Sequence, residues 1–143
     1  MTHEPNAAKA SPGRATVIVI DDNPANVLLL QRALRLRDDL EVLVESDGRR
    51  GFELVSAQKP DLVLVDLHLP TMDGESILQA LQADPATAEI PVVVISGDAT
   101  AETKRRLHQA GAQHYLEKPF KIPTLLELVA RILGAPRGND EIG

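Results

Sequence analysis

The sequence of 143 residues contains no cysteine, no tryptophan and only three aromatic residues, which are Phe52, Tyr115 and Phe120. Without cysteine the chain forms neither a disulfide framework nor a thiolate nucleophile. This composition suits a reducing compartment, so we expect a cytoplasmic protein. Three aromatic rings are too few to form a stacking surface for single-stranded nucleic acid. The core must therefore be built from aliphatic side chains.

Positive charge and long apolar runs are also scarce. The 15 lysines and arginines are outnumbered by 21 aspartates and glutamates, which gives a formal net charge of −6. An acidic surface repels phosphate backbones, so we expect no direct binding to nucleic acid. The first residues lack the apolar core of a signal peptide, and no later apolar run approaches the length of a membrane span. We therefore expect no membrane association.

The sequence does contain a regular alternation of strand-like and helix-like periods, within an ordinary globular composition of 43% apolar and 25% charged residues. The expected strands are 16–20, 40–44, 61–66, 91–96 and 113–117, and the expected helices are 24–37, 48–58, 74–82, 100–110 and 121–133. Residues 16–133 thus form one domain. We expect a flexible N-terminal tail at 1–15 and a C-terminal tail or linker at 134–143.

Successive βα units with continuous apolar strands predict a doubly wound α/β fold. Right-handed crossovers then place helices on both faces of a parallel sheet. The helix expected at 121–133 is strongly amphipathic, whereas the helix at 100–110 offers the sheet only alanines and Thr103 besides Leu107. We therefore expect the helix at 100–110 to be held by less apolar area and to shift more easily.

Polar residues stand at the ends of four predicted strands. In a doubly wound sheet, ligands bind outside the carboxyl ends of the strands, where the strand order reverses. We therefore expect these side chains to converge there: Asp21, Asp22, Asp66, Ser96 and Lys118. Three carboxylates about 4 Å apart repel one another by roughly 4 kcal/mol per pair at an effective dielectric constant of about 20, so they need a cation. Oxygen ligands favour Mg²⁺, for which Mn²⁺ can substitute, over zinc.

The position of Asp66 at the end of a buried strand predicts a nucleophile that accepts a phosphoryl group. The cation and Lys118 would neutralise the charge that builds on the phosphoryl oxygens. Ser96 would donate a hydrogen bond to one of these oxygens. Either Asp98 or Thr100 can cap the following helix, which would leave the Ser96 hydroxyl free for this role.

Four segments carry a resemblance to a known family: VIVIDDNPANVLLLQRAL, LVLVDLHLPTMDG, VVVISGD and GAQHYLEKPF. In this order and spacing they resemble the receiver domain of two-component response regulators over 16–133. The resemblance implies a flavodoxin-like (βα)5 fold, with a five-stranded parallel sheet of order 2-1-3-4-5 and helices on both faces.

The resemblance also implies a role for each matching residue. Asp66 would be the phosphoacceptor, and Lys118 would bind the phosphoryl group. The Mg²⁺ ligands would be Asp21, Asp22, Asp66 and the backbone carbonyl of His68. Ser96 and Tyr115 match the pair of switch side chains of the family, in which the serine moves toward the phosphoryl group and the aromatic residue turns inward behind it.

Two further positions match sites at which the family tunes the lifetime of the acyl phosphate. These are His68, two residues after the acceptor, and Asp98, two residues after the switch serine. We hypothesise that His68 controls the entry of water. The Lys118–Pro119 peptide bond is often cis in the family, and the sequence leaves its isomer open.

The resemblance predicts a signalling switch that catalyses only its own phosphorylation and dephosphorylation and is otherwise no enzyme. The phosphodonor would be a sensor histidine kinase or a histidine phosphotransfer protein. Phosphorylation would change the face formed by the segments 100–110, 113–117 and 121–133, and that face would control an output domain or protein. Such domains also form homodimers, although no residue of this sequence compels one.

Two alternatives remain open at this point. The first is an aspartyl-phosphate phosphatase similar to the haloacid dehalogenase group, which needs a second aspartate two residues after the nucleophile. This chain has His68 there. The second is an interaction module of the same fold that never meets phosphate, against which the acidic site argues. Among other polar residues, we expect Asp73 to cap a helix and the remaining histidines, His3, His108 and His114, to lie on the surface.

Overall fold

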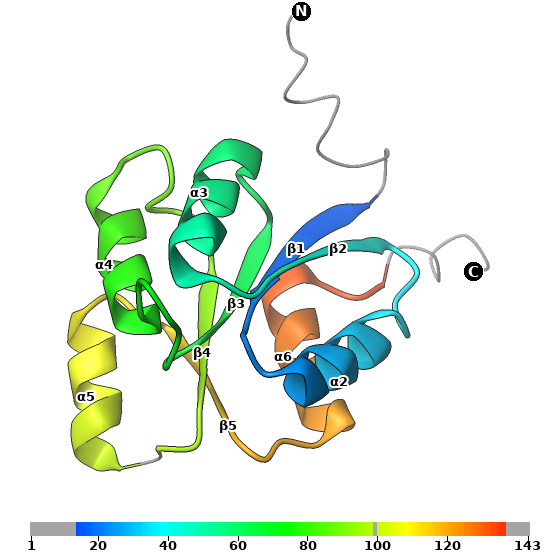
Figure 1. Ribbon diagram of the computed structural model, residues 1–143. Helices are drawn as coiled ribbons and strands as arrows, with labels where there is room; N and C mark the ends of the chain where they lie inside the picture. The colour runs from blue at the N-terminus through cyan, green and yellow to red at the C-terminus, as the bar shows by residue number, and fades with distance from the viewer. Residues whose placement is uncertain (1–13, 99, 137–143) are drawn as a thin grey trace, which may run out of the picture.

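A computed structural model describes residues 14–98 and 100–136 of the chain. Its sheet contains five parallel strands in the order β2-β1-β3-β4-β5, as predicted (Figure 1). The strands are β1 (Ala15–Ile20), β2 (Leu40–Glu45), β3 (Leu62–Asp66), β4 (Val92–Ser96) and β5 (His114–Glu117). The chain runs from β1 to β2 on one side and returns to β3 on the other, so the strand order reverses between β1 and β3. This reversal locates the ligand-binding edge of the fold.

Five helices flank the sheet: α2 (Pro24–Leu34), α3 (Gly48–Gln58), α4 (Gly74–Ala83), α5 (Ala101–Gln109) and α6 (Ile122–Leu133). Figure 1 shows α3, α4 and α5 on one face and α2 and α6 on the other. Side chains of Asn23, Asp47, Asp73 and Thr100 accept backbone hydrogen bonds in the first turns of α2 to α5, which fixes where these helices begin. None of the described helices is long and apolar enough to cross a lipid bilayer.

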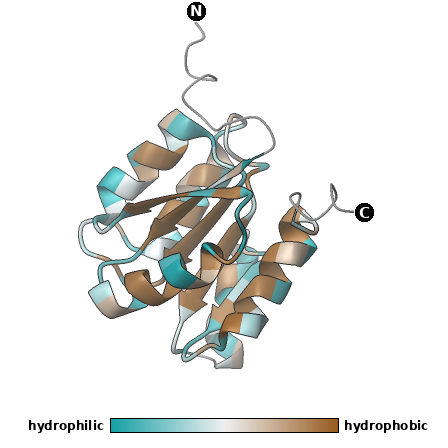
Figure 2. Ribbon diagram, turned by 90° about the vertical axis from the view of Figure 1, so that its right-hand side faces the viewer, coloured by the Kyte–Doolittle hydropathy of each residue, from teal (hydrophilic) through white to brown (hydrophobic). Residues whose placement is uncertain are grey.

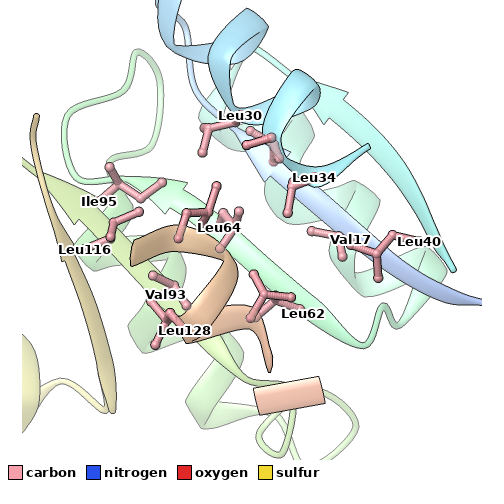
Figure 3. Close-up of a cluster of buried hydrophobic side chains, with 14 of the residues drawn as sticks. Val17, Leu30, Leu34, Leu40, Leu62, Leu64, Val93, Ile95, Leu116 and Leu128 are labelled. Carbon is pink, nitrogen blue, oxygen red and sulfur yellow. The ribbon is translucent and has the colours of Figure 1, made fainter. Parts of the chain in front are cut away.

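The sheet separates the core into two aliphatic clusters, because successive strand residues point to opposite faces. Figure 2 shows the hydrophobic strands enclosed between amphipathic helices. In one cluster, Leu30 and Leu34 of α2 and Leu128 of α6 pack against the strands, as Figure 3 shows. The other cluster joins α3, α4 and α5 to the opposite face of the same strands, through side chains such as Ile18, Val63, Val94, Ile77 and Leu107.

Helix α5 buries fewer apolar side chains than α6. Its buried residues are Thr103 and Leu107, whereas α6 buries Leu125, Leu128 and Val129. Less buried apolar area means a smaller hydrophobic contribution to holding the helix in place. By this comparison α5 has fewer apolar side chains against the sheet than α6, and its easier displacement stays a prediction.

Helix α2 ends at Leu34, three residues before the predicted end. The backbone N–H groups of Leu36 and Arg37 donate to the carbonyls three residues earlier, at 3.1 and 3.0 Å. The last turn therefore tightens into 3₁₀ geometry, which is common at helix ends. The apolar spacing of the sequence does not distinguish such a turn from α-helix.

Arg37 joins this turn to the end of α6. Its guanidinium group forms two hydrogen bonds with the carboxylate of Asp39, at 3.0 and 2.8 Å, and both side chains are buried. A third hydrogen bond, of 2.9 Å, runs from Arg37 to the carbonyl of Gly134. Gly134 was predicted to begin the C-terminal tail, and Ala15, predicted to end the N-terminal tail, is the first residue of β1. The other tail residues, with His3, lie largely outside the described part of the chain.

Candidate functional site

Three carboxylates meet at the carboxyl edge of the sheet. Asp66 is the last residue of β3, and Asp21 and Asp22 directly follow β1. Because β1 and β3 are adjacent parallel strands, their ends share one edge. One carboxylate oxygen from each of the three residues lies within 4.8 Å of the others, with Asp21 and Asp66 buried and Asp22 exposed. The structure thus brings together the acidic residues that the sequence singled out.

Asp21 has an environment that suits a cation. Its side chain is 1% exposed, and Oδ1 accepts a hydrogen bond from the backbone N–H of Asn23 at 2.9 Å. Oδ2 is buried and has no hydrogen-bond partner among the described residues. Burial raises the pKa of Asp21 above its usual value. The hydrogen bond from Asn23 lowers this pKa in part, and the negative charge of Asp66 raises it further. An unpartnered buried oxygen beside two more carboxylates fits a hard cation such as Mg²⁺.

Lys118 supplies the positive charge of the site. It follows β5, and its backbone N–H donates to the carbonyl of Ser96 at 2.9 Å. Its Nζ lies 3.4 Å from Oδ1 of Asp66. The peptide bond between Lys118 and Pro119, whose isomer the sequence left open, is cis.

Ser96 ends β4 and is 1% exposed. Its Oγ accepts a hydrogen bond from the backbone N–H of Asp98 at 2.9 Å. Thr100 does cap α5, as one of the two expected candidates, through a hydrogen bond that its Oγ1 accepts from the N–H of Thr103. The Ser96 hydroxyl is nevertheless engaged as an acceptor rather than free. Its own proton can still be donated to a phosphoryl oxygen.

Tyr115 lies on β5 and contacts the same loop. Its hydroxyl donates to the carbonyl oxygen of Asp98. Nζ of Lys104, on α5, is 5.3 Å from the centroid of the tyrosine ring, which is within range of a cation–π interaction. Both residues predicted as switch side chains, Ser96 and Tyr115, therefore bond to the backbone of Asp98.

The carboxylate of Asp98 points into α5. It accepts hydrogen bonds from the backbone N–H and hydroxyl of Thr100, at 3.1 and 3.0 Å, and from the hydroxyl of Thr103 at 2.8 Å. These bonds lower the pKa of Asp98 below its usual value, and the bond from the backbone N–H of Thr100 has the largest effect. The role of Asp98 in the lifetime of the acyl phosphate, which the family resemblance implies, stays a prediction, and the sequence did not reveal these partners.

The histidines are dispersed. His68 is exposed, two residues after Asp66, and the role of its backbone carbonyl as a metal ligand stays a prediction. His108 is exposed as expected, with Nδ1 3.2 Å from the carbonyl of Ala112. His114 is only partly exposed, which corrects its predicted surface position, because it lies on β5 between α5 and α6. Burial, and then the charge of Arg131, lower its pKa below 6.5.

The loop between β3 and α4 packs closely on its neighbours, which sequence reasoning missed. A Cβ on Gly74 would lie 2.4 Å from the carbonyl oxygen of Asp66, and one on Gly48 would lie 1.8 Å from that of Met72. Thr71 has a φ of 66°, a left-handed value that is rare for a β-branched residue. Its Oγ1 accepts a hydrogen bond of 2.9 Å from the backbone N–H of Arg49 in the first turn of α3. The loop that follows the candidate phosphoacceptor is thus bonded to α3.

The fold is a doubly wound α/β sheet, and its candidate site places three carboxylates and a lysine at the edge where the strand order reverses. The sequence matches the response regulator receiver domain family over residues 17–130, and the chain belongs to this family. Receiver domains are the parts of two-component systems that histidine kinases phosphorylate on an aspartate. They act as signalling switches rather than as classical enzymes.

Individual relatives differ in length. RpaA, a DNA-binding dual master transcriptional regulator of Synechocystis sp., is 34% identical over 126 residues, which are 88% of this chain and 51% of RpaA. The polar-differentiation response regulator DivK of Brucella anthropi is 29% identical over 83% of this chain and 96% of DivK. The chain thus spans about half the length of RpaA and most of DivK.

A solved structure with the same fold is the receiver domain of a sensor histidine kinase from Pseudomonas aeruginosa. It has a TM-score of 0.77 and 27% sequence identity, and the match covers 85% of this chain and 99% of that domain. That domain holds a magnesium ion in its active-site cleft.

Proposed function

We propose that Asp66 accepts a phosphoryl group from a histidine of a partner protein, in a reaction that depends on Mg²⁺. The observation that carries this proposal is the position of Asp66 between two other carboxylates and the ammonium group of Lys118. The donor is a sensor histidine kinase or a histidine phosphotransfer protein. Mn²⁺ can take the place of Mg²⁺ because the ligand oxygens suit both ions.

In this reaction, a carboxylate oxygen of Asp66 attacks the phosphorus atom of a phosphohistidine. A P–O bond forms as the P–N bond breaks, and the imidazole leaves with the electron pair and takes up a proton. Lys118, whose Nζ lies 3.4 Å from Oδ1 of Asp66, pairs with an oxygen of the transferred group. Ser96 donates its hydroxyl proton to another oxygen.

Asp21, Asp22 and Asp66 hold the Mg²⁺, together with the backbone carbonyl of His68. The buried, unpartnered Oδ2 of Asp21 supports this assignment. When bound, the ion supplies positive charge that offsets both the carboxylates and the charge that accumulates on the phosphoryl oxygens.

Phosphorylation then changes the surface formed by α5, β5 and α6, which controls an output domain or protein. The small apolar contribution of α5 supports this choice of moving element, since a helix with few buried side chains costs little to displace. His68 and Asp98 set the lifetime of the acyl phosphate. His68 controls water entry, so dephosphorylation of His68→Ala should differ in rate from that of the native protein.

The test is phosphorylation with acetyl phosphate in the presence of MgCl₂, followed by intact-mass measurement. We expect the native protein to gain one hydroxylamine-sensitive phosphoryl group, and EDTA or the substitution Asp66→Asn to abolish the gain. Asp73→Asn is a matched control, because Asp73 is another acidic residue of the same loop but caps α4 through the N–H of Ser76. A phosphoryl group on Asp66→Asn, or none on the native protein, would refute the proposal.

A further inference from the structure

Asp98 forms hydrogen bonds through its N–H, its carbonyl and its carboxylate, and each leads to a different element. The N–H donates to Oγ of Ser96 at 2.9 Å, and the carbonyl accepts from the hydroxyl of Tyr115. The carboxylate accepts from Thr100 and Thr103 at the start of α5. One residue therefore connects the end of β4, the side chain from β5 and the first turn of α5.

Thr103 is the buried one of the two threonines that bind the carboxylate of Asp98. Its side chain is 5% exposed and faces the core from the first turn of α5. Its Oγ1 donates to Oδ2 of Asp98 at 2.8 Å, and its backbone N–H donates to Oγ1 of Thr100 at 3.2 Å. A hydrogen bond to an ionised carboxylate is stronger than one between neutral groups. The bond to Asp98 therefore ties the loop after Ser96 to the body of the helix.

Other contacts of α5 are few enough for the helix to follow the loop. Leu107 is its other buried side chain. The ion pair between Arg106 and Glu75 on α4 is 3.0 Å long, but the arginine is 51% exposed, so solvent screens it. A displacement of Asp98 thus meets little resistance from the rest of the helix.

We propose that Thr103 is a positioning residue of the switch, which transmits movement of the Ser96 loop to α5 through the carboxylate of Asp98. This inference rests on the proposed phosphorylation of Asp66. In this proposal the Ser96 side chain turns, so that its oxygen moves toward the phosphoryl group and the bond that it accepts from the N–H of Asp98 at 2.9 Å is altered. The loop then shifts, and the anchored carboxylate moves the first turn of α5 with it. Asp98 acts here through the helix, in addition to any effect on water at the acyl phosphate.

The sequence provides its own probe of this movement. Tyr115 is the single tyrosine of the chain, and there is no tryptophan. Its intrinsic fluorescence therefore reports the surroundings of this one side chain, which include the contact between its hydroxyl and the carbonyl of Asp98. Hydrogen exchange of the amides in α5 reports the other end of the connection.

The test compares Thr103→Val, which keeps the shape of the side chain but removes the hydroxyl, with Thr103→Ser, which restores it. Thr87→Val is a matched control. Thr87 is another buried threonine, 2% exposed, whose hydroxyl donates to the carbonyl of Leu81 at the end of α4. Each protein is examined before and after treatment with acetyl phosphate and MgCl₂, by intact mass, amide exchange and tyrosine fluorescence.

We expect Thr103→Val to be phosphorylated to the native extent. Before phosphorylation, its first-turn amides in α5 should exchange about fivefold faster, because one net hydrogen bond is lost. After phosphorylation, α5 should no longer change its exchange, and the fluorescence change of Tyr115 should be lost or reduced. Thr103→Ser should restore both signals, and Thr87→Val should leave both as in the native protein.

Native exchange in α5 of unphosphorylated Thr103→Val would overturn the inference, as would a native response to phosphorylation. If the native protein takes up no phosphoryl group, the proposed function fails. In that case the exchange of the unphosphorylated variants still decides whether Thr103 holds α5 to Asp98.

Discussion

Replacing Asp66 with asparagine should stabilise the metal-free protein, although it removes the proposed phosphoacceptor. Carboxylate oxygens of Asp66, Asp21 and Asp22 lie within 4.8 Å of one another, and Nζ of Lys118 lies 3.4 Å from Asp66. At an effective dielectric constant of about 20, each repulsion of Asp66 is worth about 3.5 kcal/mol and the attraction to Lys118 about 5 kcal/mol. The two repulsions thus exceed the attraction by about 2 kcal/mol, and solvent around Asp22 and Lys118 reduces this to about 1 kcal/mol.

The assay is urea unfolding of the native protein and of Asp66→Asn, first in EDTA and then with increasing MgCl₂. In EDTA, the variant should have the larger free energy of unfolding, by about 1 kcal/mol. Added Mg²⁺ should stabilise the native protein by about 2.7 kcal/mol at one hundred times its dissociation constant. The variant has lost one ligand and should gain less, so the order of the two stabilities should reverse.

Asp38→Asn provides the control for this comparison. Asp38 is exposed, outside the acidic cluster, and its substitution changes the net charge by the same amount. We expect it to change the stability by less than about 0.5 kcal/mol, with or without Mg²⁺. A variant Asp66→Asn that is less stable than the native protein in EDTA would show that the attraction to Lys118 dominates. The electrostatic reasoning would then be wrong.

Three further predictions concern other parts of the fold. Gly74→Ala should lower the free energy of unfolding by about 2 kcal/mol or more in urea titrations, because its Cβ would lie 2.4 Å from the backbone oxygen of Asp66. The lowered pKa of His114 means that the unfolded chain binds more protons than the folded one, so stability should fall as the pH falls through the range just below 6.5. His114→Gln should flatten that slope in urea midpoints measured across this range. Thr71→Val keeps the β-branched shape at a φ of 66° but loses the hydroxyl that accepts from α3. It should destabilise by about 1 kcal/mol, whereas Thr71→Ser should not.

The sequence predicted the strands and most helix ends to within one or two residues, because caps and apolar periods are local signals. Asp73, for example, caps α4 as predicted, through a bond from the N–H of Ser76. The convergence of the acidic residues followed from a general property of doubly wound sheets together with the strand ends. These predictions did not require knowledge of any side-chain conformation.

The remaining features depend on the conformations of particular side chains and loops. The bonds from Thr103 to Asp98 and from Arg37 to Gly134 require the positions of whole side chains, which no local pattern specifies. The left-handed conformation of Thr71 runs against the preference of its own residue type. The contact of this loop with α3, through the hydrogen bond from the N–H of Arg49 to Oγ1 of Thr71, helps to hold that conformation.

The sheet divides the core into two clusters that are covered by different helices. The cluster beneath α2 and α6 shares no helix with the one beneath α5. A rearrangement confined to α5 would therefore leave the cluster of α2 and α6 packed, whereas a change that reaches α6 has to pass through the strands that the two clusters share. Substitutions on the exposed face of α5 should accordingly cost the fold little stability, because Thr103 and Leu107 are the side chains that this helix buries.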